Sequence, residues 1–429
     1  MSKIGRLVVV GLGYVGLPLA VALARKFEVI GFDINSHRIA QLRGGHDRTR
    51  EIADEELGRT SLHLTSAPED CSGADIYIVT VPTPVDDRNQ PDLSALLSAT
   101  HMIARAIDPA KCPTIIYEST VYPGVTEQIC GGEIERTGKL TRGRDFRLGY
   151  SPERINPGDR THTIDQITKV IAGEDAQVLD QMADMYGAIT SAGVFRAASI
   201  KAAEGAKAIE NAQRDINIAF MNEVAQIFSK IDVSVWDVLA AAKTKWNFLP
   251  FEPGLVGGHC IGVDPYYLSH LAQQLGHHPE VILSGRAIND GMGTWVADAL
   301  HERLAIKADK AGKPGRALVL GLTFKEDVPD LRNSRVFDVV QRLREHGHSV
   351  DVADPLADPD ELAREHGLAT VEPAGSRYDL VVGAVAHARY RELGPAQLEA
   401  LLEPGGTLAD LKGMWRELQF SPGTDRWSL

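Results

Sequence analysis

The chain has 429 residues, of which 44% are hydrophobic and 24% charged, a composition typical of a globular protein. Its net charge of −13, from 58 acidic and 45 basic residues, argues against a general binding surface for nucleic acid or an anionic membrane. No two of the four cysteines have the CxxC spacing, so neither a metal site nor a disulfide framework is expected. No apolar run is long enough for a signal peptide or a membrane span, and a cytoplasmic protein is expected.

The first part of the chain alternates between strand and helix patterns. Residues 6–13, RLVVVGLG, predict a buried strand, residues 14–27 an apolar helix, and EVIGFDIN, from residue 28, a second strand that ends at Asp33. Further strands are predicted at 76–81 and 114–118, with helical stretches between them. Such alternation is typical of a parallel, doubly wound sheet, and we expect this domain to cover residues 1–195.

The segment GLGYVG lies between the first predicted strand and the first predicted helix. Gly11 would allow a tight turn, Gly13 would let the backbone approach a pyrophosphate, and Gly16 would let the helix pack closely on the strand. The N–H groups at the helix start would bind the phosphates, with Tyr14 and Val15 beside them. The pattern predicts a dinucleotide site, and a glycine turn without a ligand is the alternative.

The second predicted strand ends at Asp33, 22 residues after Gly11. A carboxylate there would accept hydrogen bonds from both ribose hydroxyls and would repel a 2′-phosphate, so the sequence favours NAD over NADP. Arg38, in the helix that follows, could lie against the adenine ring or could be an ordinary exposed helix arginine.

Three loops follow later strands of this domain, at the sheet edge where ligands bind. Thr83 lies in TVPTPVDDRNQPDL and Thr120 in YESTVYPG. Each threonine alone could be a turn residue, but two at successive strand ends favour contacts with a cofactor. In the third loop, GYSPERINPG, Glu153 and Arg154 stand between two prolines and could belong to a site or form a solvated ion pair.

Residues 196–308 are mainly helical in pattern, and we expect them to form a central domain. Residues 198–231 lack proline, and their apolar positions recur every three to four residues, which predicts one long helix. Lys207, Asn211 and Arg214 share a face of this helix. Such a stripe usually faces solvent, but the alanines and isoleucines around it also allow a buried lysine suited to acid–base chemistry.

The Gly-rich segment GLVGGHCIGVDPYYL covers residues 254–268. It carries Cys260 behind Gly257 and Gly258, and Asp264 follows four residues later. The glycines would let a substrate approach the thiol, but a nucleophilic thiolate needs a nearby base or positive charge. Asp264 supplies no positive charge, although it could orient a water or a lysine. The spacing leaves both a structural and a nucleophilic cysteine open.

The last part of the chain, residues 309–429, is a degenerate echo of the first, with a strand, a glycine turn, a helix and a strand ending in Asp354. The whole chain is therefore predicted to be an α/β protein with two Rossmann-like doubly wound domains joined by a central helical domain. Lys325, Arg332 and Arg335 cluster after the first strand of this last domain, and Lys412 could join them. They could clamp phosphates or form a solvated basic loop.

Seven strings, in order, resemble the UDP-glucose/GDP-mannose dehydrogenase family of nucleotide-sugar 6-dehydrogenases over roughly residues 4–415. They are GLGYVGLPLA, TVPTP, ESTVYPG, SPERINPG, AKAIENAQRDINIAFMNE, GGHCIGVDPYYL and GLTFKEDVPDLRNS. The sequences of these strings are most similar to those of the UDP-N-acetylglucosamine or -galactosamine 6-dehydrogenases of Vi-antigen and O-antigen polysaccharide synthesis. The resemblance implies NAD as cofactor, a UDP-sugar as substrate bound by the last domain, and a homodimer formed through the long helix.

The resemblance also implies a four-electron oxidation. The C6 hydroxyl is oxidised to an aldehyde, which Cys260 captures, and a second oxidation gives a thioester that water hydrolyses to the uronic acid. The residues implied in catalysis are Cys260, Lys207, Asn211, Asp264, Glu153 and Thr120. Glu153 matches a base in hydrolysis, and Asp264 and Thr120 match positions that order the water.

Binding residues are implied in the same way. Those at the substrate are Glu153, Arg154, Ile155, Lys207, Asn211, Arg214, Gly257, Phe324, Lys325 and Lys412. Those at the cofactor are Gly11, Gly13, Tyr14, Val15, Gly16, Asp33, Arg38, Thr83, Thr120 and Arg332, the last at the pyrophosphate.

Two departures bear on the substrate. Val263 stands where UDP-glucose enzymes often carry lysine, and His259 where they tend to have a smaller residue. Both favour the N-acetylhexosamine branch over UDP-glucose, and neither separates gluco, galacto and manno sugars. Two other classes of function stay open. One is a one-step NAD alcohol dehydrogenase with a structural Cys260, and the other is a non-catalytic NAD- and nucleotide-binding regulator.

Overall fold

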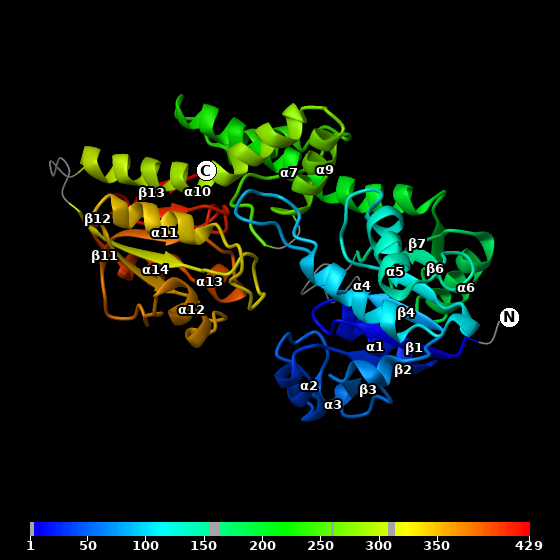
Figure 1. Ribbon diagram of the computed structural model, residues 1–429. Helices are drawn as coiled ribbons and strands as arrows, with labels where there is room; N and C mark the ends of the chain where they lie inside the picture. Colours follow the sequence, from blue (N-terminus) through cyan, green and yellow to red (C-terminus); the bar gives the residue numbers. More distant parts are fainter. Residues whose placement is uncertain (1–3, 155–162, 259–260, 308–313) are drawn as a thin grey trace. The chain divides into compact units, whose positions relative to one another are not determined.

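The computed structural model describes residues 4–154, 163–258, 261–307 and 314–429 (Figure 1). The chain divides into two compact units, Met1–Glu210 with Tyr266–His278, and Asn211–Pro265 with Pro279–Leu429. Each unit is built on one sheet. No helix among the described residues combines the length and apolar character that a membrane span requires.

The first sheet is a doubly wound sheet, as predicted. Its strands are β1 (Arg6–Val10), β2 (Glu28–Phe32), β3 (His63–Thr65), β4 (Ile76–Val79), β5 (Thr114–Tyr117), β6 (Arg147–Tyr150), β7 (Lys169–Gly173) and β8 (Val194–Arg196). In the described part of the unit, these eight strands have the order β3-β2-β1-β4-β5-β6-β7-β8. The strand order reverses between β1 and β4, where such sheets bind ligands. One pair, β6 with β7, is antiparallel, which the sequence analysis did not foresee.

Helices cover both faces of this sheet, which is why β1 and its neighbours are apolar throughout. Leu7, Val8 and Val9 of β1 are fully buried. The helical elements of this region are α1 (Gly16–Ala24), α2 (Ser36–Arg43), α3 (Asp54–Leu57), η1 (Pro68–Cys71), α4 (Ser94–Ala106), η2 (Pro109–Lys111), the π-helix η3 (Val125–Cys130), α5 (Gly131–Gly138) and α6 (Ala176–Gly187).

The long helix predicted at 198–231 is α7 (Ile200–Ser229). The boundary between the two units falls inside it, after Glu210. The other helices of the middle segment are α8 (Val235–Ala242), α9 (Asp264–Gln274) and α10 (Glu280–Lys307). The helical middle segment predicted from the sequence is therefore present.

The second unit contains a parallel sheet. Its strands are β9 (Arg316–Leu320), β10 (Ser349–Ala353), β11 (Tyr378–Gly383), β12 (Leu402–Asp410) and β13 (Asp425–Ser428), with helices α11 (Val336–Glu345), α12 (Pro359–His366), α13 (Ala388–Arg391) and α14 (Pro395–Ala400). In the described residues, these five strands have the order β10-β9-β11-β12-β13. Ala317 and Val319 face a core that includes Met292 of α10, whereas Leu318 and Leu320 pack with Trp415 on the other side. Figure 1 shows α10 running beside α11 along this unit.

The same type of glycine turn follows the first strand of each sheet. The N–H of Gly11 donates to Phe32 at 2.8 Å, and the N–H of Gly321 donates to Ala353 at 2.8 Å. Both glycines have a left-handed backbone, with φ of +95° and +92°. The second unit thus keeps the strand–glycine turn of a dinucleotide-binding sheet, as the sequence echo predicted.

Gly321→Ala tests how tightly this second turn is packed. A Cβ atom at Gly321 would lie 2.5 Å from Val385 Cβ, whereas a Cβ atom at Gly375, with φ of +83°, would meet nothing within 4 Å. We expect Gly321→Ala to lower the free energy of unfolding by about 2–4 kcal/mol, from backbone strain plus overpacking. Gly375→Ala, the control, should cost about 1 kcal/mol from strain alone. Equal losses in urea denaturation would contradict this assignment.

Candidate functional site

The turn after β1 has the form of a dinucleotide cradle. A Cβ atom at Gly16 would lie 1.8 Å from Gly11 O and 2.3 Å from Thr80 Oγ1, so only glycine lets α1 pack against the turn. A Cβ atom at Gly13 would meet nothing within 4 Å, which leaves open space above the start of the helix. In the described structure no side chain caps α1 and no acidic residue lies in its first turn. The N–H groups beside Tyr14 and Val15 therefore suit a pyrophosphate, and NAD fits this turn.

Asp33 is held rigidly just past the end of β2. Its Oδ2 accepts the N–H of Leu12 at 2.9 Å, and its Oδ1 accepts the N–H of Asn35 at 2.9 Å. The residue is partly exposed, and each carboxylate oxygen can accept a further hydrogen bond from a ribose hydroxyl. Ile34, next to it, is 82% exposed, an apolar surface suited to an adenine ring. Sequence reasoning missed Ile34 because an isoleucine at a strand end looks like a core residue.

Arg38 is buried, not the exposed helix arginine that the sequence allowed. Its Nε donates to Leu12 O at 3.0 Å and its Nη2 to Asp47 Oδ1 at 2.8 Å. The guanidinium therefore links Leu12, in the glycine turn, to Asp47, and its contact with the adenine stays a prediction.

The loops that carry the two predicted threonines are tied together. Thr83 Oγ1 donates to Thr120 O at 2.7 Å, and Ser119 Oγ donates to Val81 O at 2.7 Å. The Tyr267 hydroxyl donates to Thr83 O at 2.5 Å. The hydroxyl of Thr83 thus joins the loops after β4 and β5, at the carboxyl edge of the sheet beside the switch point.

Glu153 and Arg154 do not form the ion pair with each other that the sequence allowed. Glu153 is buried and binds Lys169 Nζ at 2.8 Å, whereas Arg154 is exposed and pairs with Glu210 at 2.9 Å. Sequence reasoning missed Lys169, which looks like the first residue of a strand. Ile155 lies outside the described residues.

The predicted polar stripe of α7 is largely buried. Lys207 and Asn211 are 9% and 5% exposed, and Arg214 is exposed. In the second unit, Asn211 Nδ2 donates to Asp264 Oδ2, and Arg214 Nη1 approaches Asn211 Oδ1 at 3.5 Å. No hydrogen bond or ion pair from the described residues reaches the ammonium of Lys207. The stripe is therefore not the solvated face that the sequence left open.

His259 and Cys260 lie outside the described residues, but the glycines that precede them are described. A Cβ atom at Gly257 would lie 2.5 Å from Asn333 O, and one at Gly258 would lie 2.6 Å from Phe324 Cδ2. The glycines therefore let this segment pack closely on the loop that follows β9.

The start of the same segment is fixed by a side chain of α7. Gly254 N donates to Asn222 Oδ1 at 2.8 Å, and Asn222 Nδ2 donates to Gly254 O at 3.0 Å. Asn222 is fully buried, so it satisfies a peptide group that water cannot reach.

The other cysteines are poor nucleophiles. Burial raises the pKa of the Cys71 thiol to about 12, and burial raises the pKa of Cys130 to about 12 as well. Burial also raises the pKa of Cys112. These three cysteines have free thiols, and none is poised to react near neutral pH.

Four of the predicted substrate residues meet in the second unit. Gly257, Phe324, Lys325 and Lys412 line one hollow. Arg335 also reaches it, but its guanidinium pairs with the carboxylates of Asp290 and Asp338. The predicted cation cluster after β9 is thus divided, and Lys325 and Lys412 are the members at the hollow that suit phosphate groups.

Arg332 forms a bidentate pair with Asp330, at 2.9 and 2.7 Å. Its guanidinium is about two-fifths exposed, so it remains accessible to a ligand.

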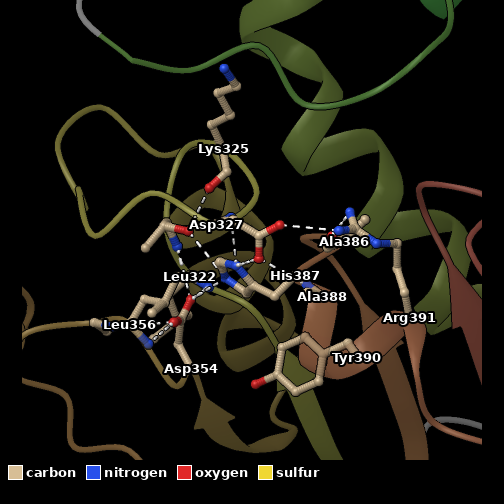
Figure 2. A network of polar contacts seen from close by, with 12 residues as sticks. Leu322, Lys325, Asp327, Asp354, Leu356, Ala386, His387, Ala388, Tyr390 and Arg391 are labelled. Carbon is tan, nitrogen blue, oxygen red and sulfur yellow. Dashed lines mark hydrogen bonds and ion pairs between the residues drawn. The ribbon is translucent and has the colours of Figure 1, made fainter. Parts of the chain in front are cut away.

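The loop that carries Lys325 is held by a buried histidine (Figure 2). The N–H of Asp327 donates to His387 Nδ1 at 3.0 Å, which places the ring proton on Nε2. Nε2 then lies 3.1 Å from Asp354 Oδ2 and 3.2 Å from Thr323 Oγ1. Asp354 in turn accepts the N–H of Leu322. Figure 2 shows the side chain of Lys325 pointing away from this network. Sequence reasoning missed His387, because nothing in GAVAH marks its partners.

The chain matches known proteins over nearly its whole length. Three models of the UDP-glucose/GDP-mannose dehydrogenase family match in order: the NAD binding domain (residues 5–190), the central domain (201–291) and the UDP binding domain (318–417). Protein CapL of Staphylococcus aureus is 48% identical over 422 residues, 98% of this chain and 99% of that protein. The UDP-N-acetyl-D-glucosamine 6-dehydrogenase of Pseudomonas aeruginosa is 48% identical over 412 residues, 95% of this chain and 96% of that protein. The solved structure of a UDP-D-ManNAc dehydrogenase from Pyrococcus horikoshii aligns with a TM-score of 0.87 at 28% identity, over 99% of this chain and 98% of that one.

Two substitutions at His387 test its hold on the Lys325 loop. Asparagine retains an acceptor near the Nδ1 position, and glutamine retains a donor near the Nε2 position. We expect His387→Asn to weaken UDP binding about tenfold, because it removes the contact with the Asp354 carboxylate, and His387→Gln to weaken it less. Calorimetric titration with UDP measures both. NAD affinity should not change, and His366→Asn, whose ring stacks on Phe337, is the control. Unchanged UDP affinity in both His387 variants would refute this role.

Proposed function

This chain belongs to the UDP-glucose/GDP-mannose dehydrogenase family and is an NAD-dependent oxidoreductase, and from that premise we propose that it oxidises C6 of a UDP-N-acetylhexosamine to the uronic acid. The observation that carries the proposal is the hollow formed by Gly257, Phe324, Lys325 and Lys412, directly beside the segment that leads to Cys260. Two lysines at a hollow suit a diphosphate, and a cysteine two residues after Gly258 in the sequence would suit covalent capture of the sugar.

UDP-GlcNAc is the first substrate to consider, and UDP-GalNAc the second. The support is the 48% identity to a relative named for UDP-GlcNAc, compared with 28% for the structure named for UDP-ManNAc. UDP-ManNAc and UDP-glucose are the alternatives within the family. Synthesis of a surface polysaccharide is the process we propose for the uronic acid product.

The assembly belongs to the same proposal. We expect three domains, at residues 1–195, 196–308 and 309–429, and a homodimer formed through α7. Support for the dimer comes from exposed apolar side chains on that helix. Ile209, Phe220 and Ile227 are 59%, 58% and 53% exposed. Large apolar side chains exposed together on a protein surface are typical of an interaction site.

The first oxidation uses the α7 residues. Gly11, Gly13 and Asp33 would hold NAD⁺ at the glycine turn, where it would supply the hydride acceptor for each of the two oxidations of C6. Lys207 takes the proton of the C6 hydroxyl, directly or through water, and Asn211 donates a hydrogen bond to the same oxygen. The Cys260 thiolate then attacks the aldehyde carbon to form a C–S bond, and the oxyanion takes up a proton to give the thiohemiacetal.

The second oxidation converts the thiohemiacetal into a thioester, which water hydrolyses. Asp264 and Thr120 order the water, and Glu153 takes its proton as the oxygen attacks the acyl carbon. The C–S bond breaks, and Cys260 leaves as a thiolate. The balance is one alcohol, two NAD⁺ and one water in, and one carboxylate, two NADH and three protons out.

The stoichiometry of NADH tests the covalent route. We expect two NADH per sugar from the natural protein, with UDP-GlcNAc the fastest of UDP-GlcNAc, UDP-GalNAc, UDP-ManNAc and UDP-glucose. In Cys260→Ser the complete reaction should fall by at least about 1000-fold, because the thiolate nucleophile is lost. Absorbance at the NADH band, with the uronic acid counted by chromatography, measures both. One NADH per sugar and an unimpaired serine variant would instead indicate a one-step dehydrogenase with a structural cysteine.

A further inference from the structure

Four buried polar side chains meet where β5, β6, β7 and α6 come together in the first unit (Figure 1). Lys169 opens β7, and its Nζ lies 2.8 Å from Glu118 Oε2 and 2.8 Å from Glu153 Oε2. The Tyr186 hydroxyl donates to the other oxygen of Glu118. The side chains of Lys169, Glu118 and Glu153 are only 2%, 0% and 7% exposed. Glu118 and Lys169 have no part in the mechanism above. Lys169 nevertheless contacts Glu153, the base of that mechanism, and Glu118 contacts Lys169.

The charges of this group do not cancel. Two carboxylates share one ammonium, so the fully ionised group carries a net negative charge away from water. Burial opposes the charge on Lys169, but Glu118 and Glu153 outweigh it and raise the pKa of Lys169. Burial raises the pKa of Glu118, and the charge of Lys169 only partly offsets that rise. Lys169 is therefore protonated at neutral pH, and the two carboxylates compete for its charge.

The same contacts fix the orientation of Glu153. Lys169 binds its Oε2, and the N–H of Arg154 donates to its Oε1 at 2.6 Å. The carboxylate is therefore held at both oxygens. Among the residues that the structure describes, the other titratable or charged groups near it are Tyr186 from α6, Glu118 just after β5, and Arg154, whose guanidinium pairs with Glu210.

We propose that Lys169 and Glu118 are positioning residues for thioester hydrolysis: Lys169 holds Glu153 in one orientation and in its ionised form, and Glu118 moderates that effect by sharing the ammonium. The inference rests on the proposed function, because hydrolysis is the step that gives Glu153 a proton to accept. As Glu153 takes the proton from the attacking water, the charge of the group falls to neutral while Lys169 stays in place. The group thus contains a base whose strength is set by a second carboxylate.

Opposite charge changes should move the pH profile in opposite directions. Glu153 acts only as a carboxylate, so hydrolysis is lost as the pH falls. In Glu118→Gln, Glu153 is the one carboxylate of the pair that still binds Lys169, so it stays ionised to lower pH. The acid limb of the pH profile of hydrolysis should therefore shift down by about one pH unit. Lys169→Met removes the cation and should shift the acid limb up by at least about one unit. Lys169→Arg keeps the charge and should stay close to the natural protein.

The decay of the acyl-enzyme is the readout that separates this role from a purely structural one. Single turnovers with UDP-GlcNAc and NAD⁺, quenched and weighed as intact protein, give the hydrolysis rate at each pH. At neutral pH we expect Lys169→Met to accumulate acyl-enzyme and to hydrolyse it about 10–100-fold more slowly, with the KM for NAD⁺ unchanged. Lys111→Met, at a pair on the surface with Asp75, is the control for removing a lysine charge.

Each result decides one question. An acid limb that does not move in Glu118→Gln overturns the inference, and this variant carries the test alone if Lys169→Met does not fold. Shifts in the same direction in Glu118→Gln and Lys169→Met also overturn it. A natural protein that forms no acyl-enzyme and yields one NADH per sugar would refute the proposed function instead, whatever the variants do.

Discussion

The satisfaction of buried backbone groups by polar side chains of α7 is the constraint on which the loops of this protein depend. Glu204 accepts the N–H groups of the loop after β5, and Asn222 pairs with both polar groups of the Gly254 peptide. A buried peptide group without a partner costs about 1–3 kcal/mol, so these loops keep their conformation only while α7 supplies its side chains. Asn211, on the same helix, donates to the side-chain carboxylate of Asp264 at the start of α9. The helix that carries predicted catalytic residues is thus also the one that holds the loops in place.

Local patterns were enough to predict the elements and the glycine turn. The strand and helix periods predicted the ends of β1, α1, β2 and α7 to within about three residues, because backbone geometry links burial to spacing directly. The roles of Gly11 and Gly16 also followed from the sequence, since a missing Cβ has the same consequence in any such turn. The single antiparallel pair of the first sheet could not be predicted, because strand direction depends on the path of the connection and leaves no mark in the strands themselves.

Contacts between distant residues were beyond the sequence. Glu153 and Arg154 are neighbours, which suggested a pair, but their partners, Lys169 and Glu210, are 16 and 56 positions away. His387 looked like a residue at a strand end, and its three partners come from two other segments. In each case the residue type indicated that a partner was needed, and only the fold determined which one.

Two segments that are far apart in the chain pack directly against each other, through Gly257 on Asn333 and Gly258 on Phe324. A side chain at either glycine would push directly on the loop that carries Lys325, and any change in that loop would push back on the segment leading to Cys260. Residues 254–258 and the loop that follows β9 therefore cannot change shape independently of each other. An engineer who wishes to transplant either segment from a relative would have to move residues 254–258 and 322–334 together.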